Sequence, residues 1–266
     1  MKAVLAALPA VLAAQLAVAA PAQEQQCCAV VELRQYITYP GKRDDLVELF
    51  EREFIESQEA VGITMLGQFR DVNDPHRFTW LRGFPDMPAR KQSLTDFYFG
   101  PLWKSWSKEA NATLYDNDDV LLLRPASPGA GFAPASSKRP PTSATAPRAG
   151  FVVATLYYFK QPVNAEFVAH FNADLMPAFQ RSGAHVLGRF VTEPAANTFE
   201  RLPVRENVNV FVWFARFADR ADYARYNARL AQDVRWRDQL FASLYKSLAR
   251  APETLMLEPA ARSMIY

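Results

Sequence analysis

The sequence predicts an α+β fold in which two tandem ferredoxin-like units, each with the order βαββαβ, pack sheet to sheet as an intrachain α/β barrel. The main observation is a repeat: Gly62-Ile-Thr-Met-Leu-Gly-Gln-Phe69 returns as Gly183-Ala-His-Val-Leu-Gly-Arg-Phe190, an offset of 183 − 62 = 121 residues. A second echo pairs Trp80 with Trp213, at an offset of 213 − 80 = 133. Repetition of this kind indicates one unit written twice. The difference between the offsets places about a dozen extra residues between the second and third strands of the later copy.

Composition permits two folded units and gives no basis for a polyanionic partner. Of the 266 residues, 50% are hydrophobic and 13% are aromatic, which is enough for two cores. The formal net charge is +2. Because this charge is close to neutral, we expect neither nucleic acid nor an anionic membrane surface as a partner.

The N-terminus, residues 1–22, has the pattern of a secretory signal peptide. Met1-Lys2 gives a short positive start, the run from Val4 to Ala20 is apolar, and Ala17-Val-Ala19 or Ala20-Pro-Ala22 offers small residues before a cleavage site. The run is rich in Ala and lacks charged residues on its far side, unlike a membrane span. We therefore expect a bacterial protein that is periplasmic or secreted and has no membrane span after cleavage.

Two adjacent cysteines, Cys27 and Cys28, follow this segment. A bridge between sequence neighbours passes through a small ring and is strained. The pair therefore has two alternative interpretations, a cross-link between chains in an oxidising compartment or a tail without a role. It is too isolated from histidine for a zinc site.

The first unit spans residues 29–125 and opens with an alternating strand. One face carries Val31, Leu33 and Ile37, and the other carries Glu32, Arg34 and Tyr36. A helix follows, with Asp44 and Asp45 at the positive end of its dipole. The remaining predicted elements are strands at 63–70 and 77–84, a helical region from Pro88, and a closing strand at 120–125.

A linker rich in Pro, Ser, Ala and Gly, residues 126–149, leads to a second unit at 150–259. Its predicted strands lie at 151–159, 184–191, 208–217 and 255–259, and Asn164 is suited to cap its first helix. The loop from Thr192 to Asn207 accounts for the extra residues.

In the split βαβ plan, helices cover one sheet face and leave the other bare. Two units in one chain can cover these bare faces by packing the sheets together. We expect this to enclose a lumen lined by the second face of each strand.

These residues resemble the NIPSNAP family. The resemblance lies in Glu32-Leu-Arg-Gln-Tyr36, Tyr39-Pro-Gly-Lys42, the strand Gly62 to Phe69, and Asp74-Pro-His-Arg followed by Trp80-Leu-Arg-Gly-Phe84. It is good over residues 30–125 and weaker over 150–259, which implies tandem NIPSNAP domains. The resemblance implies the dimeric α/β-barrel fold. It carries over no catalytic residues, since bacterial members are generally of unassigned function.

Polar residues predicted to face the lumen are the candidate ligand-binding set. In the first unit they are Glu32, Arg34, Tyr36, Gln68, Arg70 and, across neighbouring strands, Arg82. In the second unit they are Tyr158, His185 and Arg189, with Ala154 and Leu156 in the places of Glu32 and Arg34. The planar fork of Arg34 suits an anionic or carbonyl group. The alternative is a structural ion pair between Glu32 and Arg34.

No cofactor and no metal is expected. The histidines His76, His170 and His185 have no second ligand at metal spacing. A haem ligand at His185 is the remaining alternative. The sequence holds no phosphate loop, nucleophile elbow or dinucleotide fingerprint.

Two functional hypotheses follow. In the first, the protein binds a small apolar or aromatic molecule in the inter-sheet cavity and, if it is an enzyme, acts as a cofactor-independent monooxygenase or isomerase. In the second, it is a non-enzymatic interaction or assembly scaffold with a protein partner or as a homo-oligomer. An open polar lumen favours the first hypothesis and a packed lumen the second.

Overall fold

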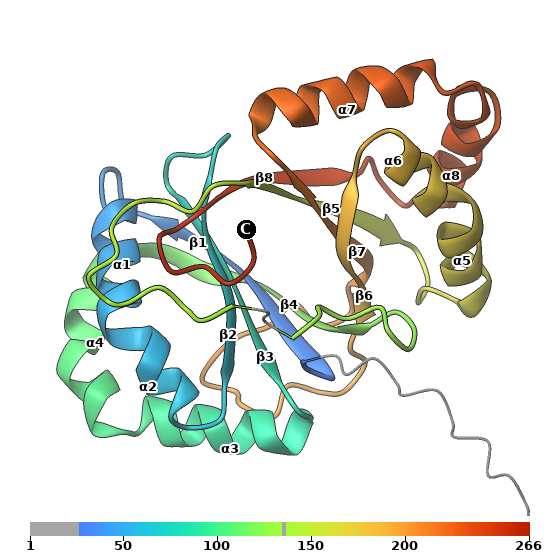
Figure 1. Cartoon of the computed structure of the whole chain (residues 1–266). Coiled ribbons are helices and arrows are strands. Elements are labelled where there is room, and N and C mark those ends of the chain that lie inside the picture. The colour runs from blue at the N-terminus through green and yellow to red at the C-terminus, as the bar shows by residue number, and fades with distance from the viewer. Residues whose placement is uncertain (1–26, 135–136) are drawn as a thin grey trace, which may run out of the picture.

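The computed structural model describes residues 27–134 and 137–266 (Figure 1). The predicted signal peptide lies outside the described residues. The first unit runs β1 (Val30–Thr38), α1 (Arg43–Leu49), η1 (Phe50–Phe54), α2 (Ile55–Glu59), β2 (Thr64–Asp71), β3 (Arg77–Phe84), α3 (Met87–Tyr98), α4 (Pro101–Thr113) and β4 (Leu114–Pro125). The helix α3 begins where the Asp86 carboxylate accepts a hydrogen bond from the Ala89 amide, 2.7 Å away.

The second unit repeats this order. Its elements are β5 (Phe151–Phe159), α5 (Ala165–His170), η2 (Phe171–Leu175), α6 (Met176–Arg181), β6 (His185–Thr192), β7 (Asn209–Phe217), α7 (Arg220–Gln232), η3 (Trp236–Leu240), α8 (Phe241–Ser247) and β8 (Glu253–Pro259). The predicted cap is confirmed, because the Asn164 side chain accepts a hydrogen bond from the Phe167 amide. No helix among the described residues is long and apolar enough to cross a membrane.

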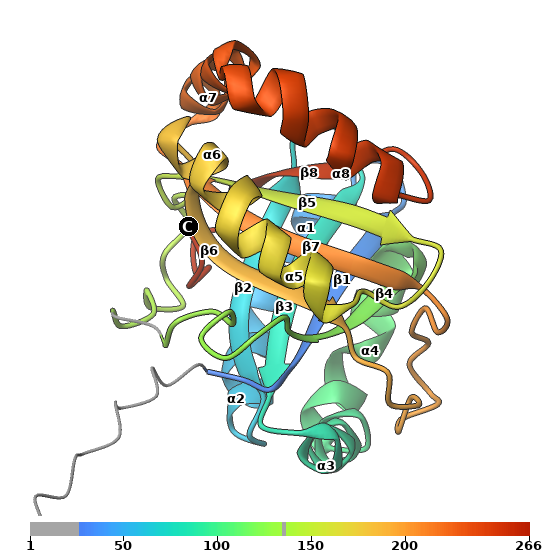
Figure 2. The same ribbon diagram turned by 90° about the vertical axis from the view of Figure 1, so that its right-hand side faces the viewer.

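The two sheets join edge to edge into one closed barrel with the strand order β1-β3-β2-β8-β5-β7-β6-β4. One seam pairs β2 with β8, and the other pairs β4 with β6. The predicted α+β barrel of two ferredoxin-like units is thus confirmed. Helices α1 to α4 cover the outside of the first unit, and α5 to α8 cover the outside of the second (Figure 2).

The barrel interior is filled by apolar side chains from both units. They include Leu33, Phe69, Leu81, Leu156, Val212 and Leu257, all 0% exposed. Part of the linker joins them, since the Phe132 ring lies 4.7 Å from Phe190 and 5.1 Å from Phe214 between ring centres. The described interior is therefore packed, which is the state that favours the scaffold hypothesis.

The sequence predicts that Glu32, Arg34 and Tyr36 lie on the lumen face of β1, and this prediction is wrong. Val31 and Leu33 point into the barrel, whereas Tyr36 belongs to the core beneath α1 to α4. In register, Arg34 pairs with Trp80 and Val120, which belong to that same helix-side core. Alternation divides the strand into two sets, but both sets are buried here. The pattern therefore could not say which layer each set faces.

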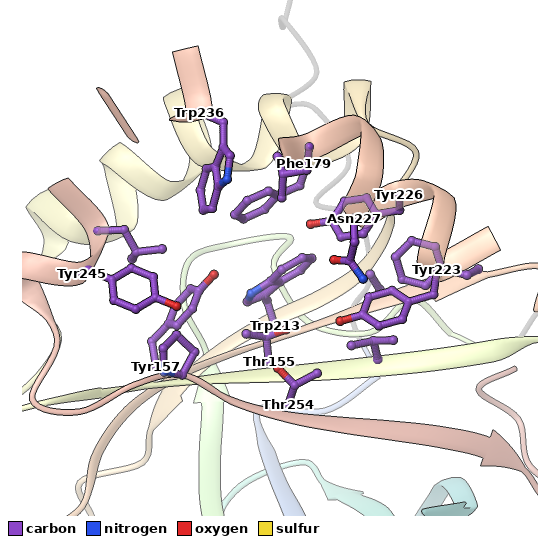
Figure 3. Close-up of a pocket in the computed structure, with 16 residues that line it drawn as sticks. Thr155, Tyr157, Phe179, Trp213, Tyr223, Tyr226, Asn227, Trp236, Tyr245 and Thr254 are labelled. Carbon is purple, nitrogen blue, oxygen red and sulfur yellow. The ribbon is translucent and has the colours of Figure 1, made fainter. Parts of the chain in front are cut away.

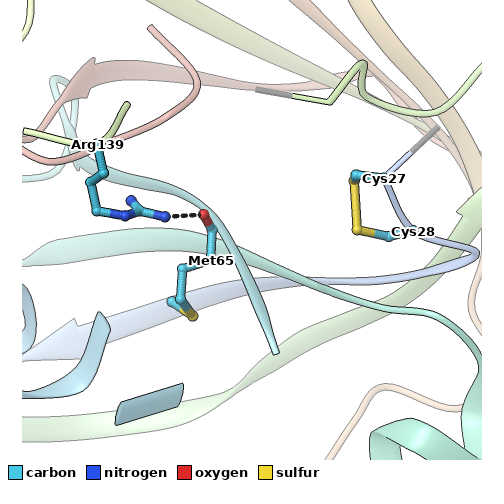
Figure 4. Close-up of a disulfide and its surroundings, with 4 residues drawn as sticks. All are labelled: Cys27, Cys28, Met65 and Arg139. Carbon is cyan, nitrogen blue, oxygen red and sulfur yellow. Dashed lines mark hydrogen bonds between the residues drawn. A yellow bond between two sulfur atoms is a disulfide. The ribbon is translucent and has the colours of Figure 1, made fainter. Parts of the chain in front are cut away.

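The two cysteines form a disulfide with each other (Figure 4). Cys28 is 3% exposed and lies at the end of the barrel interior. The Cys27 amide donates a hydrogen bond to the carbonyl of Phe132, 3.3 Å away. In this chain the pair is therefore bridged internally and packed against the linker, rather than free in a tail.

The repeated Leu-Gly-x-Phe motif has a structural cause. In both copies the register shifts at the glycine, between Met65 and Gly67 in β2 and between Val186 and Gly188 in β6. A Cβ at Gly67 would lie 2.5 Å from the Phe69 ring, and one at Gly188 would lie 2.8 Å from the Phe190 ring. Each glycine thus leaves room for the phenylalanine two residues later to fold back into the barrel.

We expect Gly67→Ala to lower the free energy of unfolding by about 1–3 kcal/mol, because the added methyl group overpacks the Phe69 ring. Urea denaturation measures this change. Combining it with Phe69→Leu should recover part of the loss, so the two effects should not add. Strict additivity would contradict the steric explanation.

Candidate functional site

One carboxylate on β1 collects three guanidinium groups beneath the helices of the first unit. Glu32 Oε2 accepts hydrogen bonds from Arg34 Nη1 and Arg82 Nε, each at 2.7 Å. Its other oxygen, Oε1, accepts from Arg90 Nε at 2.6 Å. All four side chains are 0% exposed. We call Glu32, Arg34, Arg82 and Arg90 the arginine cluster.

The arginine cluster carries an excess of positive charge, since three guanidinium groups and one carboxylate sum to +3 − 1 = +2. Burial raises the pKa of Glu32, but the attraction of Arg82, Arg34 and Arg90 outweighs it and holds the pKa well below its usual range. Burial lowers the pKa of Arg90, which the nearby Glu32 offsets only in part. Glu32 is therefore an ionised anchor and not a proton carrier.

Neutral groups complete the surroundings of the cluster. Arg82 Nη1 donates to Gln58 Oε1 at 2.8 Å, and Arg34 Nε donates to the Tyr36 hydroxyl at 2.8 Å. Burial raises the pKa of Tyr36 to about 12, so its hydroxyl keeps its proton. The centre of the Trp80 ring lies 5.4 Å from the guanidinium carbon of Arg34 and 5.0 Å from that of Arg82.

The structure brings four of the six first-unit candidates together: Glu32, Arg34, Tyr36 and Arg82. Gln68 lies on the same face, opposite Trp80, with its buried side-chain amide unpaired among the described residues. Arg70 does not join this group and instead forms an ion pair with Asp44, at 2.7 Å between Nε and Oδ1. The sequence reasoning missed Arg90, because it comes from helix α3 and has no fixed spacing to β1.

The three second-unit candidates do not meet. Tyr158 lies in the barrel interior and donates a hydrogen bond from its hydroxyl to Glu253 Oε2 at 2.8 Å. His185 is exposed at the start of β6. Arg189 lies beneath the helices, where its Nη1 contacts Met176 Sδ at 3.2 Å. These residues therefore do not form a common site.

The two units align differently from the prediction. Arg34 pairs with Trp80 in the first barrel half, and Thr155 pairs with the matched Trp213 in the second. The counterparts of Glu32, Arg34 and Arg82 are therefore Val153, Thr155 and Ala215, not Ala154 and Leu156. The two repeat offsets together held this information, because 32 + 121 = 153, 34 + 121 = 155 and 82 + 133 = 215.

At the position of the arginine cluster, the second unit has a cavity of about 180 Å³ between its sheet and helices α6 to α8 (Figure 3). Its lining comprises Val153, Thr155, Tyr157, Phe179, Trp213, Ala215, Phe217, Tyr223, Tyr226, Asn227, Leu230, Trp236, Leu244, Tyr245, Pro252 and Thr254. We call this space the aromatic cavity. It exists because three small side chains replace one glutamate and two arginines.

Rings hold the aromatic cavity open. Phe179 stacks on Trp213 at 4.7 Å between ring centres with an angle of 7°, and Trp236 meets Phe179 edge-on at 5.2 Å. Figure 3 shows Tyr157 and Tyr245 toward one end, and Tyr223 and Asn227 toward the other. Burial raises the pKa of both Tyr157 and Tyr226. Their phenol groups stay neutral and act as hydrogen-bonding groups.

No group of three or more His, Cys, Asp or Glu residues in the described chain could hold a metal ion. The lining of the aromatic cavity has no histidine or cysteine to ligate a haem iron. The chemistry available there is hydrogen bonding and ring packing.

We expect Glu32→Gln to lower the free energy of unfolding by about 3–5 kcal/mol at pH 7, because it leaves three buried guanidinium groups without their anion. Asp44→Asn is the control, since it breaks a partly exposed ion pair on the same sheet face and should cost at most about 1 kcal/mol. Urea denaturation measures both variants.

The Glu32 contribution should also depend on pH. Its pKa is depressed in the folded protein, so its stabilisation is complete above the unfolded value of about 4.3 and is lost as the pH falls toward the folded pKa. The difference between wild type and Glu32→Gln should therefore shrink below about pH 4. A difference that stays constant down to pH 2 would contradict the ionised anchor.

The chain was compared with family models, curated proteins and solved structures. Residues 31–128 match the model of the NIPSNAP family, and no curated protein matches the sequence. A candidate monooxygenase from Fusobacterium nucleatum is similar in structure at 12% identity and a TM-score of 0.51, over 87% of this chain and 92% of that chain. An anthrone oxidase-like protein gives the same identity and score, over 87% and 91%.

A NIPSNAP family protein of unknown function from Agrobacterium tumefaciens is 20% identical, with a TM-score of 0.37, over 46% of this chain and 99% of that chain. At these identities the structural likeness concerns the fold alone. The sequence match is the stronger finding and confirms the predicted resemblance to the NIPSNAP family over residues 31–128, which cover the first unit.

Proposed function

We propose that this protein is exported and that its second unit binds a small, uncharged aromatic molecule in the aromatic cavity. The packed barrel interior moves the expected ligand away from the space between the sheets. The observation that carries the proposal is the exchange of Glu32, Arg34 and Arg82 for Val153, Thr155 and Ala215 on the same frame. This exchange leaves space where the first unit has charge.

The volume and lining define the ligand class. A cavity of about 150 Å³ lined by apolar residues can hold benzene, so about 180 Å³ suits one ring with a small substituent. None of the 16 lining residues is an aspartate, glutamate, lysine, arginine or histidine. A charged ligand would therefore lose its hydration without gaining a counter-ion. Asn227, Thr155 and the tyrosine hydroxyls can orient one polar substituent.

This assignment is one of binding, without a catalytic step. A general base needs a pKa near the working pH, and burial moves the pKa of Tyr157 and Tyr226 further above it. The aromatic cavity thus favours capture or transport of a ring compound by a non-enzymatic protein.

The export part of the proposal rests on the sequence of residues 1–22 and on the Cys27–Cys28 disulfide. Disulfides persist in oxidising compartments such as the bacterial periplasm, and this chain bridges its two cysteines. Both features support a location in the periplasm or outside the cell.

The aromatic cavity is tested with 4-methylphenol as the probe, by isothermal titration calorimetry. Ala215→Leu fills the space from β7 and should weaken binding at least tenfold. The control is Ala221→Leu, the same change at an exposed position of α7, which should leave binding unchanged. Equal affinity in Ala215→Leu and wild type, or no binding by wild type, would exclude this site.

Export is tested by expressing the full chain in a bacterial host and measuring the mass of the protein in the periplasmic fraction. We expect the mature chain to begin at Ala20 or Gln23, after one of the two small-residue sites. Recovery of only the full-length chain from the cytoplasm would contradict export.

A further inference from the structure

The insertion between β6 and β7, residues 193–208, crosses from the second unit to the first. We call it the strap. In Figure 1 it leaves β6 and runs toward α3. Phe199 and Leu202 are each 7% exposed and pack into the helix-side core of the first unit. Its ends are fixed by backbone hydrogen bonds from Glu193 to Leu122 and from Arg205 to Val120, each 2.8 Å.

The tip of the strap contacts the arginine cluster directly. Arg90 Nη1 donates hydrogen bonds to Asn197 Oδ1 at 3.0 Å and to Thr198 Oγ1 at 3.3 Å. The next residue, Phe199, places its ring 5.8 Å from Tyr98 and 6.3 Å from Phe99 between ring centres. The strap therefore presents two neutral oxygens to a guanidinium group and an aromatic ring beside them.

The arginine cluster has donors that no described residue uses. The Nη2 groups of Arg34, Arg82 and Arg90 have no hydrogen-bond partner in residues 27–134 and 137–266. Trp80 Nε1 and the side-chain amide nitrogen and oxygen of Gln68, on the adjacent strands, are also unpaired there. Buried donors without partners are costly, and charged donors most of all.

The strap therefore does not neutralise the charge of the arginine cluster. The cluster has an excess of +2, whereas Asn197 and Thr198 offer only neutral acceptors. A carboxylate brings an opposite charge and two oxygens that fit the planar guanidinium fork, whereas the Asn197 and Thr198 oxygens bring no charge. A carboxylate in the place of these two oxygens would supply the negative charge that the strap tip lacks.

We propose that the first unit has a binding site for a small aromatic carboxylate, and that the strap occupies this site as an internal substitute. The carboxylate takes the place of the Asn197 and Thr198 oxygens on Arg90 and reaches the free guanidinium donors. The ring takes the place of Phe199 against Tyr98 and Phe99. Binding therefore requires the strap to move.

This site is separate from the aromatic cavity in position and in ligand charge. It lies beneath α3 in the first unit, whereas the cavity lies in the second. Either proposal can fail while the other holds. In particular, Ala215→Leu should remove 4-methylphenol binding and leave benzoate binding unchanged.

The probe for the test is sodium benzoate, compared with sodium phosphate and sodium chloride at constant ionic strength. Calorimetry on the wild-type protein should show benzoate binding and no phosphate or chloride binding. Phe199→Ala removes the internal ring and should raise the affinity for benzoate about tenfold. Phe241→Ala, which truncates an exposed ring in the second unit, is the control and should change nothing.

Strap movement provides an independent readout. Arg201 is exposed in the strap, so trypsin can cut after it once the strap leaves the surface. Benzoate should accelerate this cut several-fold in the wild type. Arg90→Gln, which keeps Glu32 paired with Arg34 and Arg82, should abolish both binding and acceleration.

Three results would overturn the proposal. One is the absence of benzoate binding in both wild type and Phe199→Ala. Another is unchanged affinity in Arg90→Gln. The third is phosphate binding as tight as that of benzoate, which would show that the ring contributes nothing.

Discussion

The filled barrel interior determines where this protein can act. Two sheets close on each other and bury rows of Leu, Val and Phe from both units, with Phe132 of the linker added to the packing. Interiors packed in this way have few voids and tolerate little added volume. The candidate sites therefore lie on the opposite sheet faces, beneath the helices. Each unit has such a face, and the duplication supplies two copies of the same frame.

The two copies have diverged in content while keeping the frame. Trp80 and Trp213 hold equivalent register positions, and the helix that follows each of their strands begins at an aspartate cap. Beside Trp80, one carboxylate and three guanidinium groups fill the space with charge. Beside Trp213, small neutral residues leave a cavity with aromatic walls. A duplicated chain can thus hold a charged and an uncharged site without building a second fold.

Much of the fold could be predicted from the sequence, because it depends on periodicity and repetition. The repeat gave the order of the elements along the chain and the position of the insertion, and the capping preference of asparagine gave the Asn164 cap. The face of β1 could not be predicted, because both of its faces are buried and alternation does not say which layer is which. Arg90 was missed because helix α3 supplies it across the core. The role of Phe132 was missed because the composition of a linker does not predict that one of its rings packs into the barrel interior.

The position of the strap follows from the barrel topology. The β4–β6 seam brings the β6–β7 connection beside the first unit, so an insertion there reaches the arginine cluster. By the same pseudo-symmetry, the β2–β3 connection lies against the second unit. There Val72 packs on the helix-side core of that unit, and the Val72 amide donates a hydrogen bond to the Met256 carbonyl. That connection is only residues 72–76 and is too short to cross the aromatic cavity. The insertion therefore covers the arginine cluster, whereas the β2–β3 connection leaves the aromatic cavity uncovered.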